Sequence, residues 1–250
     1  MLSILFVHGA GHGAWCWHEH FTPWFEARGY TVAAPDLPGH GDLGRRGIKT
    51  IPLTAYVDAV ACAAASLKPP LILVGHSMGG FIIQKHLENA EAELAILLAS
   101  TPPAGARGMV TRMATRRPIT FAKTMLTGKA TDSPQRTRDY LFSPGTPAEV
   151  VNACHHRLQP ESTQALKDMM APLHPQRVTT PVAVIGAGHD WLVAPPKELT
   201  ATARAYHATA QTLPGGHDMM LDTAWEQAAT AIETTIAERH AHRKVPHERP

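Results

Sequence analysis

The chain has 250 residues, of which 44% are hydrophobic and 18% charged, and these proportions exclude a disordered or fibrous protein. Lys and Arg number 23 against 21 Asp and Glu, so a formal charge of +2 gives no reason to expect nucleic acid or an anionic membrane as a partner. No apolar run approaches the roughly 20 residues of a membrane span, and the first residues lack the basic and apolar regions of a signal peptide. Three cysteines at scattered positions predict neither a disulfide framework nor a zinc site. We therefore expect a cytoplasmic globular protein.

Short apolar runs alternate with segments of helical periodicity along most of the chain. Runs without polar alternation are typical of buried parallel strands, and we expect them at Leu2–Val7, Thr31–Ala34, Leu71–Val74, Leu94–Ala99, Pro181–Ile185 and Ala210–Leu213. The predicted helices are Trp17–Arg28, Leu53–Ser66, Met78–Asn89, Pro196–Tyr206 and Leu221–Arg239. This order predicts an α/β fold with a mostly parallel central sheet flanked by helices.

One long segment, residues 101–180, contains no strand-like run. Prolines divide it into short pieces, and some of these have an apolar helical face, such as Phe121, Met125 and Leu126. A helical insertion between two strands of a parallel sheet lies over their carboxyl ends, where ligands bind. We therefore predict an α/β core from residues 1–100 and 181–239, a helical cap from 101–180, and a disordered tail from 240–250.

The motif Gly75-His76-Ser77-Met78-Gly79 carries the strongest chemical signal. It follows the apolar run Leu71–Val74 and precedes a predicted helix, which is the strand–turn–helix setting of a nucleophilic serine. The turn must be sharp enough to expose the Ser77 hydroxyl, and the glycines on either side leave room for the close backbone approach. The sequence therefore predicts Ser77 as a nucleophile.

A serine nucleophile needs a base, and the base needs an acid to orient it. Among the 16 histidines, His217 follows the last predicted strand and precedes the final helix, which places it on a loop at the carboxyl edge of the sheet. Asp190 follows the strand before it, whereas no carboxylate comes directly after Leu94–Ala99. The order serine, acid, histidine is the one that this architecture uses. For Asp36 we expect a structural role in its loop.

Acyl transfer also needs donors for the oxyanion. One is expected at the backbone N–H of Met78, directly after the nucleophile. The other is expected at Ala10, in the glycine-rich loop after the first strand. The glycines Gly9, Gly11 and Gly13 of that loop do not have the G-x-G-x-x-G spacing of a dinucleotide-binding turn.

With these motifs the chain resembles the α/β-hydrolase superfamily over nearly its whole length. The stretch from His8 to Trp17, His-Gly-Ala-Gly-His-Gly-Ala-Trp-Cys-Trp, is most similar to the subgroup of plant methyl esterases and hydroxynitrile lyases with their bacterial esterase relatives. The resemblance implies the α/β-hydrolase fold, no metal or organic cofactor, and the five site residues already derived: Ser77, Asp190, His217, Ala10 and Met78.

These features predict a serine carboxylesterase that acts on a small-molecule ester. We expect its substrate pocket to include Gly9, His12, Phe121, Met125, Trp191 and Asp218. A homodimer is left open as its assembly. Three alternatives also stay open: a hydroxynitrile lyase, another carbon–carbon-cleaving enzyme or perhydrolase on the same triad, and a small-ligand receptor. Hydroxynitrile lyases that resemble this chain carry Thr at the place of Gly9 and Lys at the place of Asp218.

Overall fold

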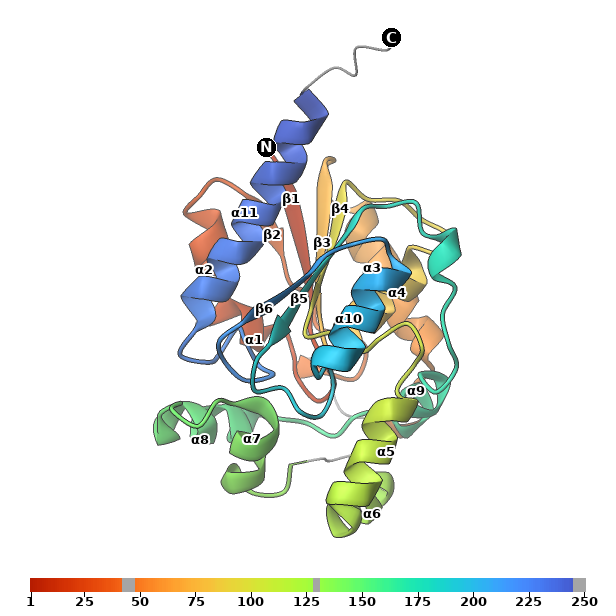
Figure 1. Cartoon of the computed structure of the whole chain (residues 1–250), viewed down its shortest axis with the longest axis vertical. Helices are drawn as coiled ribbons and strands as arrows, with labels where there is room; N and C mark the ends of the chain where they lie inside the picture. Colours follow the sequence, from red (N-terminus) through yellow and green to blue (C-terminus); the bar gives the residue numbers. More distant parts are fainter. Residues whose placement is uncertain (42–47, 128–130, 245–250) are drawn as a thin grey trace.

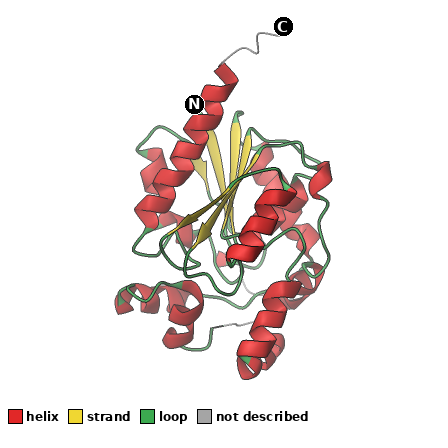
Figure 2. Ribbon diagram, viewed as in Figure 1, coloured by secondary structure: helices red, strands yellow, loops and turns green. Residues whose placement is uncertain are grey.

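The computed structural model describes residues 1–41, 48–127 and 131–244, and its centre is a six-stranded sheet in the order β2-β1-β3-β4-β5-β6. All five neighbouring pairs are parallel, and Figure 2 shows the sheet between layers of helices. The strands are β1 (Ser3–Val7), β2 (Thr31–Ala33), β3 (Leu71–His76), β4 (Leu94–Leu98), β5 (Val182–Ala187) and β6 (Ala210–Leu213). Each predicted strand is confirmed to within two residues at either end.

Helices cover both faces of the sheet because alternate strand residues point to opposite sides. In β1, Ile4 and Phe6 pack with the helices on one face, while Leu5 and Val7 pack with those on the other. The first face carries α1 (Trp15–His18), α2 (Phe21–Glu26) and α11 (Trp225–Lys244). The second carries α3 (Leu53–Ala65), preceded by the 3-10 turn η2 (Ile48–Thr50), with α4 (Met78–His86) and α10 (Pro196–Ala205).

The predicted helix Trp17–Arg28 is in fact two short helices, α1 and α2. Pro23 has no N–H and fits only the first turn of a helix, where the backbone N–H groups have no partner inside the helix. The chain therefore ends α1 at His18 and starts a new helix at Phe21, two residues before the proline. This break turns Phe21 and Phe25 onto β1, where both are fully buried.

Residues 101–180 form helices and loops without a strand among the described residues. The helices are α5 (Arg107–Arg116), α6 (Pro118–Thr127), α7 (Pro134–Leu141), α8 (Ala148–Arg157) and α9 (Thr163–Asp168), followed by the 3-10 turn η3 (Pro175–Arg177). Figure 1 shows α5 to α8 gathered beyond one end of the sheet, on the side to which the strand arrows point. We keep the name cap for residues 101–180.

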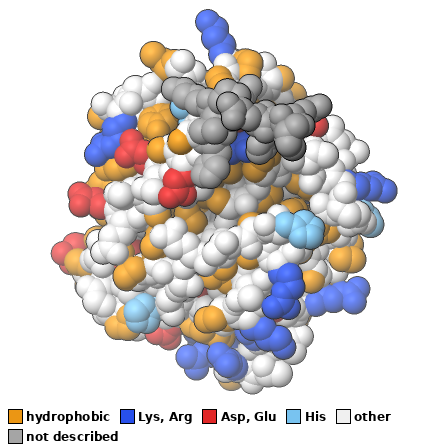
Figure 3. Space-filling model, turned by 45° about the horizontal axis from the view of Figure 1, so that its top comes forward, with side chains coloured by type: hydrophobic (Ala, Val, Ile, Leu, Met, Phe, Trp, Pro, Cys, Tyr) orange, Lys and Arg blue, Asp and Glu red, His pale blue; other side chains and the backbone are white. Residues whose placement is uncertain are grey.

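The last helix differs from its predicted bounds at both ends. It begins at Trp225 instead of Leu221 and continues to Lys244 instead of Arg239. Residues 240–244, expected in the disordered tail, are therefore helical, and the rest of that tail lies outside the described residues. Within the described part of the chain, no helix is long and apolar enough to cross a membrane. On the face drawn in Figure 3, hydrophobic side chains are dispersed among polar and charged ones.

The turn between β3 and α4 brings three backbone segments into close contact. Ser77 has a φ of 53°, in the left-handed region that residues with a Cβ rarely adopt. A Cβ added to Gly79 would lie 2.2 Å from the carbonyl oxygen of Val7, and one added to Gly75 would lie 2.6 Å from Cα of Gly80. Glycine is needed at both positions because the neighbouring atoms belong to backbone and cannot rotate away.

We expect Gly79→Ala to lower the free energy of unfolding by about 3 kcal/mol, since the added methyl must push β1 and α4 apart. The matched control is Gly145→Ala, because a Cβ there would meet no atom within 4 Å; it should change the stability by less than about 0.5 kcal/mol. Urea denaturation followed by circular dichroism measures both. Equal stabilities for the two variants would contradict the close packing at Gly79.

Candidate active site

Ser77 lies at the junction of β3 and α4, and the backbone on both sides is tied to the neighbouring strand β4. Its N–H donates to the carbonyl of Leu98 at 3.1 Å, and its own carbonyl accepts from Thr101 N–H at 3.1 Å. These bonds hold the left-handed conformation in place, although such a conformation is unfavourable for serine. The side chain, 8% exposed, lines the cavity beneath the cap.

His217 and Asp190 come from loops after two adjacent strands, β6 and β5. Nδ1 of His217 lies 2.8 Å from Oδ2 of Asp190, and both side chains are buried. The Asp190 carboxylate also accepts hydrogen bonds from the backbone N–H groups of Leu192, Val193 and Ala194 at 2.9 to 3.1 Å. These bonds fix the carboxylate, and through it the imidazole plane, so that Nε2 of His217 is the nitrogen left for proton transfer.

The charges of the pair shift both pKa values. Burial alone would raise the pKa of Asp190, but the positive charge and hydrogen bond of His217 and the backbone donors outweigh it, so the pKa lies below its ordinary value. Burial would likewise lower the pKa of His217, but the charge and hydrogen bond of Asp190 raise it above 6.5, with help from Asp218. A protonated His217 is therefore stabilised, which is what a base must become after it takes a proton.

The loop after β1 presents one of the two predicted oxyanion donors. His8 Nδ1 donates to the carbonyl of Gly9 at 2.9 Å, and its Nε2 accepts from Leu37 N–H at 3.0 Å. This pattern requires a neutral ring, and burial together with nearby His40 lowers the pKa of His8 to about 3. The N–H groups of Ala10 and Met78 donate no hydrogen bond within the described residues. Ala10 lines the cavity beneath the cap, whereas Met78, which is 1% exposed, does not.

A cavity of about 540 Å³ lies between the cap and the carboxyl ends of the strands. Its wall combines apolar cap side chains with groups from the core. Of the predicted site residues, Ala10, His12, Ser77, Phe121, Met125 and His217 line it. The structure therefore brings the predicted nucleophile and base to one cavity. A second, more open hollow of about 670 Å³ between β6 and α11 contains none of the predicted residues.

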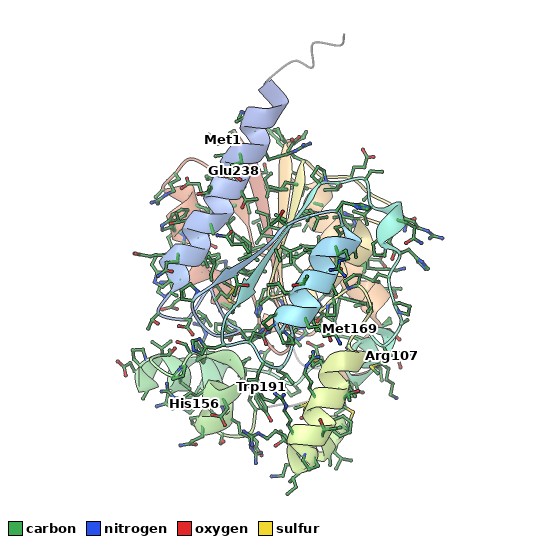
Figure 4. The ribbon with its side chains drawn as sticks, in the orientation of Figure 1. Met1, Arg107, His156, Met169, Trp191 and Glu238 are labelled. Carbon is green, nitrogen blue, oxygen red and sulfur yellow. The ribbon has the colours of Figure 1, made fainter. Side chains whose placement is uncertain are left out.

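Three residues predicted for the pocket do not line the cavity. Gly9 packs against the turn at Ser77: a Cβ there would lie 2.8 Å from Nδ1 of His76. The indole N–H of Trp191 donates to the carbonyl of Asp139 at 2.9 Å, and Figure 4 shows Trp191 between the α7–α8 and α5–α6 pairs of the cap. Asp218 points away from the cavity into a buried polar cluster. Its position next to His217 in the sequence does not determine the direction of its side chain.

The buried cluster around Asp218 includes His12, His76 and Cys154. Oδ2 of Asp218 lies 2.9 Å from His12 Nε2 and 3.8 Å from Sγ of Cys154, and Oδ1 lies 3.7 Å from His76 Nε2. The ligand atoms of His12, Cys154 and Asp218 are close enough to hold a metal ion. A metal ion would have to displace the hydrogen bond between His12 Nε2 and Asp218 Oδ2, however, and the thiol of Cys154 donates to the same oxygen. The set fits a hydrogen-bonded network better than a metal site.

Sequence analysis missed a further buried carboxylate, Glu161, at the edge of the same cavity. Glu161 follows α8 in the cap and is 3% exposed. Its Oε1 accepts from Tyr56 Oη at 2.8 Å, and its Oε2 lies 3.0 Å from Nε2 of His40 and accepts from Gly11 N–H at 3.0 Å. No local pattern marks a lone glutamate in a proline-broken segment, because its partners come from three distant parts of the chain.

Comparison with known proteins agrees with this geometry. A family model described as "Alpha/beta hydrolase family" matches residues 4–231. "Norfluorocurarine synthase 1" from a Strychnos species is 37% identical over 104 residues, which cover 40% of this chain and 39% of that protein. A rice (Oryza sativa) protein named "Probable esterase PIR7A" is 36% identical over 112 residues, 42% of this chain and 41% of the rice protein. The alignments thus span about two-fifths of these relatives.

Solved structures share the fold over nearly the full length. The methylesterase MES16 from Arabidopsis superposes with a TM-score of 0.71 over 95% of this chain and 99% of its own, at 22% sequence identity. At that level of identity the likeness concerns the fold alone. The predicted α/β-hydrolase fold is confirmed.

Replacing Asp190 by Asn should lower the pKa of His217, because the carboxylate charge and its hydrogen bond are what raise it. An NMR titration of the His217 ring protons measures the shift in the folded protein. Asp58→Asn, on the exposed surface of α3, is the matched control and should leave the titration unchanged. An unaltered His217 titration in Asp190→Asn would show that the pair is not charge-coupled.

Proposed function

The chain belongs to the alpha/beta hydrolase family, and we propose that it is a serine carboxylesterase that hydrolyses small carboxylic esters through an acyl-enzyme. The observation that carries the proposal is the Asp190–His217 hydrogen bond of 2.8 Å, because His217 shares a cavity with Ser77. The esterase relative from rice supports the same reaction class.

In the proposed cycle His217 Nε2 takes the proton of Ser77 as Oγ attacks the ester carbonyl carbon. The negative oxygen accepts hydrogen bonds from the N–H groups of Ala10 and Met78. The carbon–oxygen bond to the alcohol then breaks, and His217 gives its proton to the leaving oxygen. Water then attacks the acyl carbon while His217 takes one proton from the water. The bond to Ser77 Oγ breaks, the acid is released, and His217 gives this proton to Oγ.

The cap supports an ester with a substantial apolar part. Apolar side chains dominate the wall of the cavity away from Ser77, including Met109, Met113, Leu166 and Met170. Methionine side chains are flexible and adapt to ligands of different shape. We therefore expect the acyl or alcohol group to lie among these side chains, while the carbonyl sits at Ser77.

Ser77→Ala should lower kcat for p-nitrophenyl esters by about 10⁴- to 10⁶-fold, since residues of a triad act as a unit. The measurement is initial-rate hydrolysis of a series of increasing acyl length, with folding checked by circular dichroism. Ser66→Ala, at the exposed end of α3, is the control and should retain full activity. A Ser77→Ala enzyme with a tenth of the original activity, or a fluorophosphonate adduct on another serine, would remove Ser77 from this role.

Mandelonitrile cleavage, measured beside ester hydrolysis, separates an esterase from a hydroxynitrile lyase. Gly9 offers no hydroxyl for a cyanohydrin oxygen, and Asp218 supplies a carboxylate, paired with His12, where a related lyase carries a lysine. We therefore expect ester hydrolysis and no cleavage of mandelonitrile above the rate of Ser77→Ala. Cyanide release that depends on Ser77 and matches the rate of ester turnover would reverse the assignment. Inertness toward both substrates, with tight binding of another small molecule, would favour a receptor.

A further inference from the structure

We propose that His12 and Glu161 are positioning residues that grip the peptide group between Ala10 and Gly11 from its two ends, and so keep the Ala10 N–H aimed into the cavity. The proposal rests on the oxyanion role given to Ala10 above. It adds two side chains that do not touch the reacting atoms and act through the loop after β1. We call this arrangement the peptide clamp.

The contacts of the clamp lie on one peptide group. Its oxygen, the carbonyl of Ala10, lies 2.9 Å from Nδ1 of His12. Its N–H, that of Gly11, donates to Oε2 of Glu161 at 3.0 Å. Since a peptide group is planar, a donor on its oxygen and an acceptor on its N–H together fix the orientation of the whole plane.

The neighbouring peptide groups are held as well. The carbonyl of Gly9, which belongs to the same peptide as the Ala10 N–H, accepts from His8 Nδ1 at 2.9 Å. The carbonyl of Gly11 accepts from the N–H of Gln159 in the cap at 2.8 Å. In the three peptide groups between Gly9 and His12, the Ala10 N–H is thus the one backbone group without a hydrogen-bond partner among the described residues. An oxyanion donor works best when it needs no reorganisation during the reaction.

Hydrogen-bond chemistry requires His12 to carry a positive charge. A carbonyl oxygen only accepts, so Nδ1 must hold a proton to bond the Ala10 carbonyl. Nε2 lies 2.9 Å from Oδ2 of Asp218, whose pKa the surrounding histidines hold below its ordinary value despite burial. A carboxylate also only accepts, so Nε2 is protonated too. Burial opposes this charge, but Asp218 outweighs burial and raises the pKa of His12 above 6.5.

The other groups around His12 are consistent with this charge. His76 donates from Nε2 to the carbonyl of His217 at 3.1 Å, its Nδ1 has no partner among the described residues, and burial lowers its pKa to about 3, so it is neutral. Burial raises the pKa of the Cys154 thiol, which donates to Oδ2 of Asp218, the same oxygen that faces His12. The carboxylate of Glu161 and the rings of His8 and His217 are further titratable neighbours.

Glu161 is an anion for a parallel reason. Besides Gly11 N–H, it accepts hydrogen bonds from Tyr56 Oη and the N–H of Ser162, and it lies 3.0 Å from Nε2 of His40. Burial would raise its pKa, but these donors hold the pKa below its ordinary value. A cation on the carbonyl and an anion on the N–H therefore both strengthen the grip on the peptide.

The kinetic test compares two changes at the same carboxylate. Glu161→Gln keeps the volume but removes the charge and places an NH₂ group against donors, so we expect kcat for p-nitrophenyl butyrate to fall by about 10- to 100-fold. KM should change by less than about threefold, because the donor acts on the transition state. Tyr56→Phe, the control, removes a hydrogen bond to Oε1 and leaves Oε2 on Gly11; its kcat should stay within about threefold of the original.

Asp218→Asn is the second variant if Glu161→Gln does not fold. It keeps the shape of the side chain but removes the negative charge that stabilises protonated His12, so kcat should fall. The fall is measured on the high-pH plateau of the rate profile, because a change in the pKa of His217 does not alter the rate there. Nitrogen-15 NMR of the histidine rings is independent of activity. Both ring nitrogens of His12 should stay protonated to a higher pH in the original protein than in Asp218→Asn.

Equal kcat values for Glu161→Gln and Tyr56→Phe would overturn the positioning role, as would an unchanged plateau in Asp218→Asn. A His12 ring that loses its second proton at the same pH in both proteins would overturn the charged clamp. If the unaltered protein hydrolyses no ester, the proposed function fails and the catalytic role of the clamp fails with it. The NMR result then still reports whether His12 is charged, so the two failures are distinguishable.

Discussion

Ser77 lies between a strand and a helix with a φ of 53°, a conformation that costs a residue with a Cβ about 1–3 kcal/mol. The turn survives because its backbone is bonded to Leu98 and Thr101 and because Gly79 lets α4 lie directly on β1. This one turn exposes the hydroxyl at the carboxyl edge of the sheet and leaves the Met78 N–H without a partner among the described residues. The rest of the site is organised around these two groups.

Three buried carboxylates hold the loops around the turn. Asp190 holds His217, Asp218 holds His12, and Glu161 holds Gly11. A buried charge is costly unless hydrogen bonds and opposite charge surround it, and each of these carboxylates has an imidazole within 3.0 Å. The histidine-rich character of the site thus has a physical cause: the neutral rings of His8 and His76 bond backbone groups, and ring nitrogens of His217, His12 and His40 face the three carboxylates.

The cap contributes more than a cover for the cavity. Through Gln159 and Glu161 it bonds both ends of the Gly11 residue in the loop after β1. Through Ser143 it bonds Asp222, which also accepts from Gly216 N–H beside His217. The residues that surround the substrate are therefore tied to the same loops that carry the reaction chemistry, so the shape of the cavity and the geometry of the site are coupled.

The sequence by itself determined the strands, the order of the α/β units, the position of the cap and the motif around Ser77. These follow from local signals: continuous apolar runs, helical periodicity, and glycines on either side of a serine after a strand. It also predicted that His217 and Asp190 follow neighbouring strands, because parallel strands bring their carboxyl ends to one edge. The division of the predicted helix Trp17–Arg28 into α1 and α2 was not predicted, although Pro23, which has no N–H, indicates a helix start near it.

Only the tertiary structure decided which way the loop side chains point. Asp218 is next to His217 in the chain, yet it faces His12 and not the cavity, and Trp191 bonds the carbonyl of Asp139 in the cap. Glu161 gained its role from partners about 100 to 150 positions away: Tyr56, His40 and Gly11. A loop has no repeating geometry to fix side-chain direction, so direction there depends on buried partners that only the completed fold brings together.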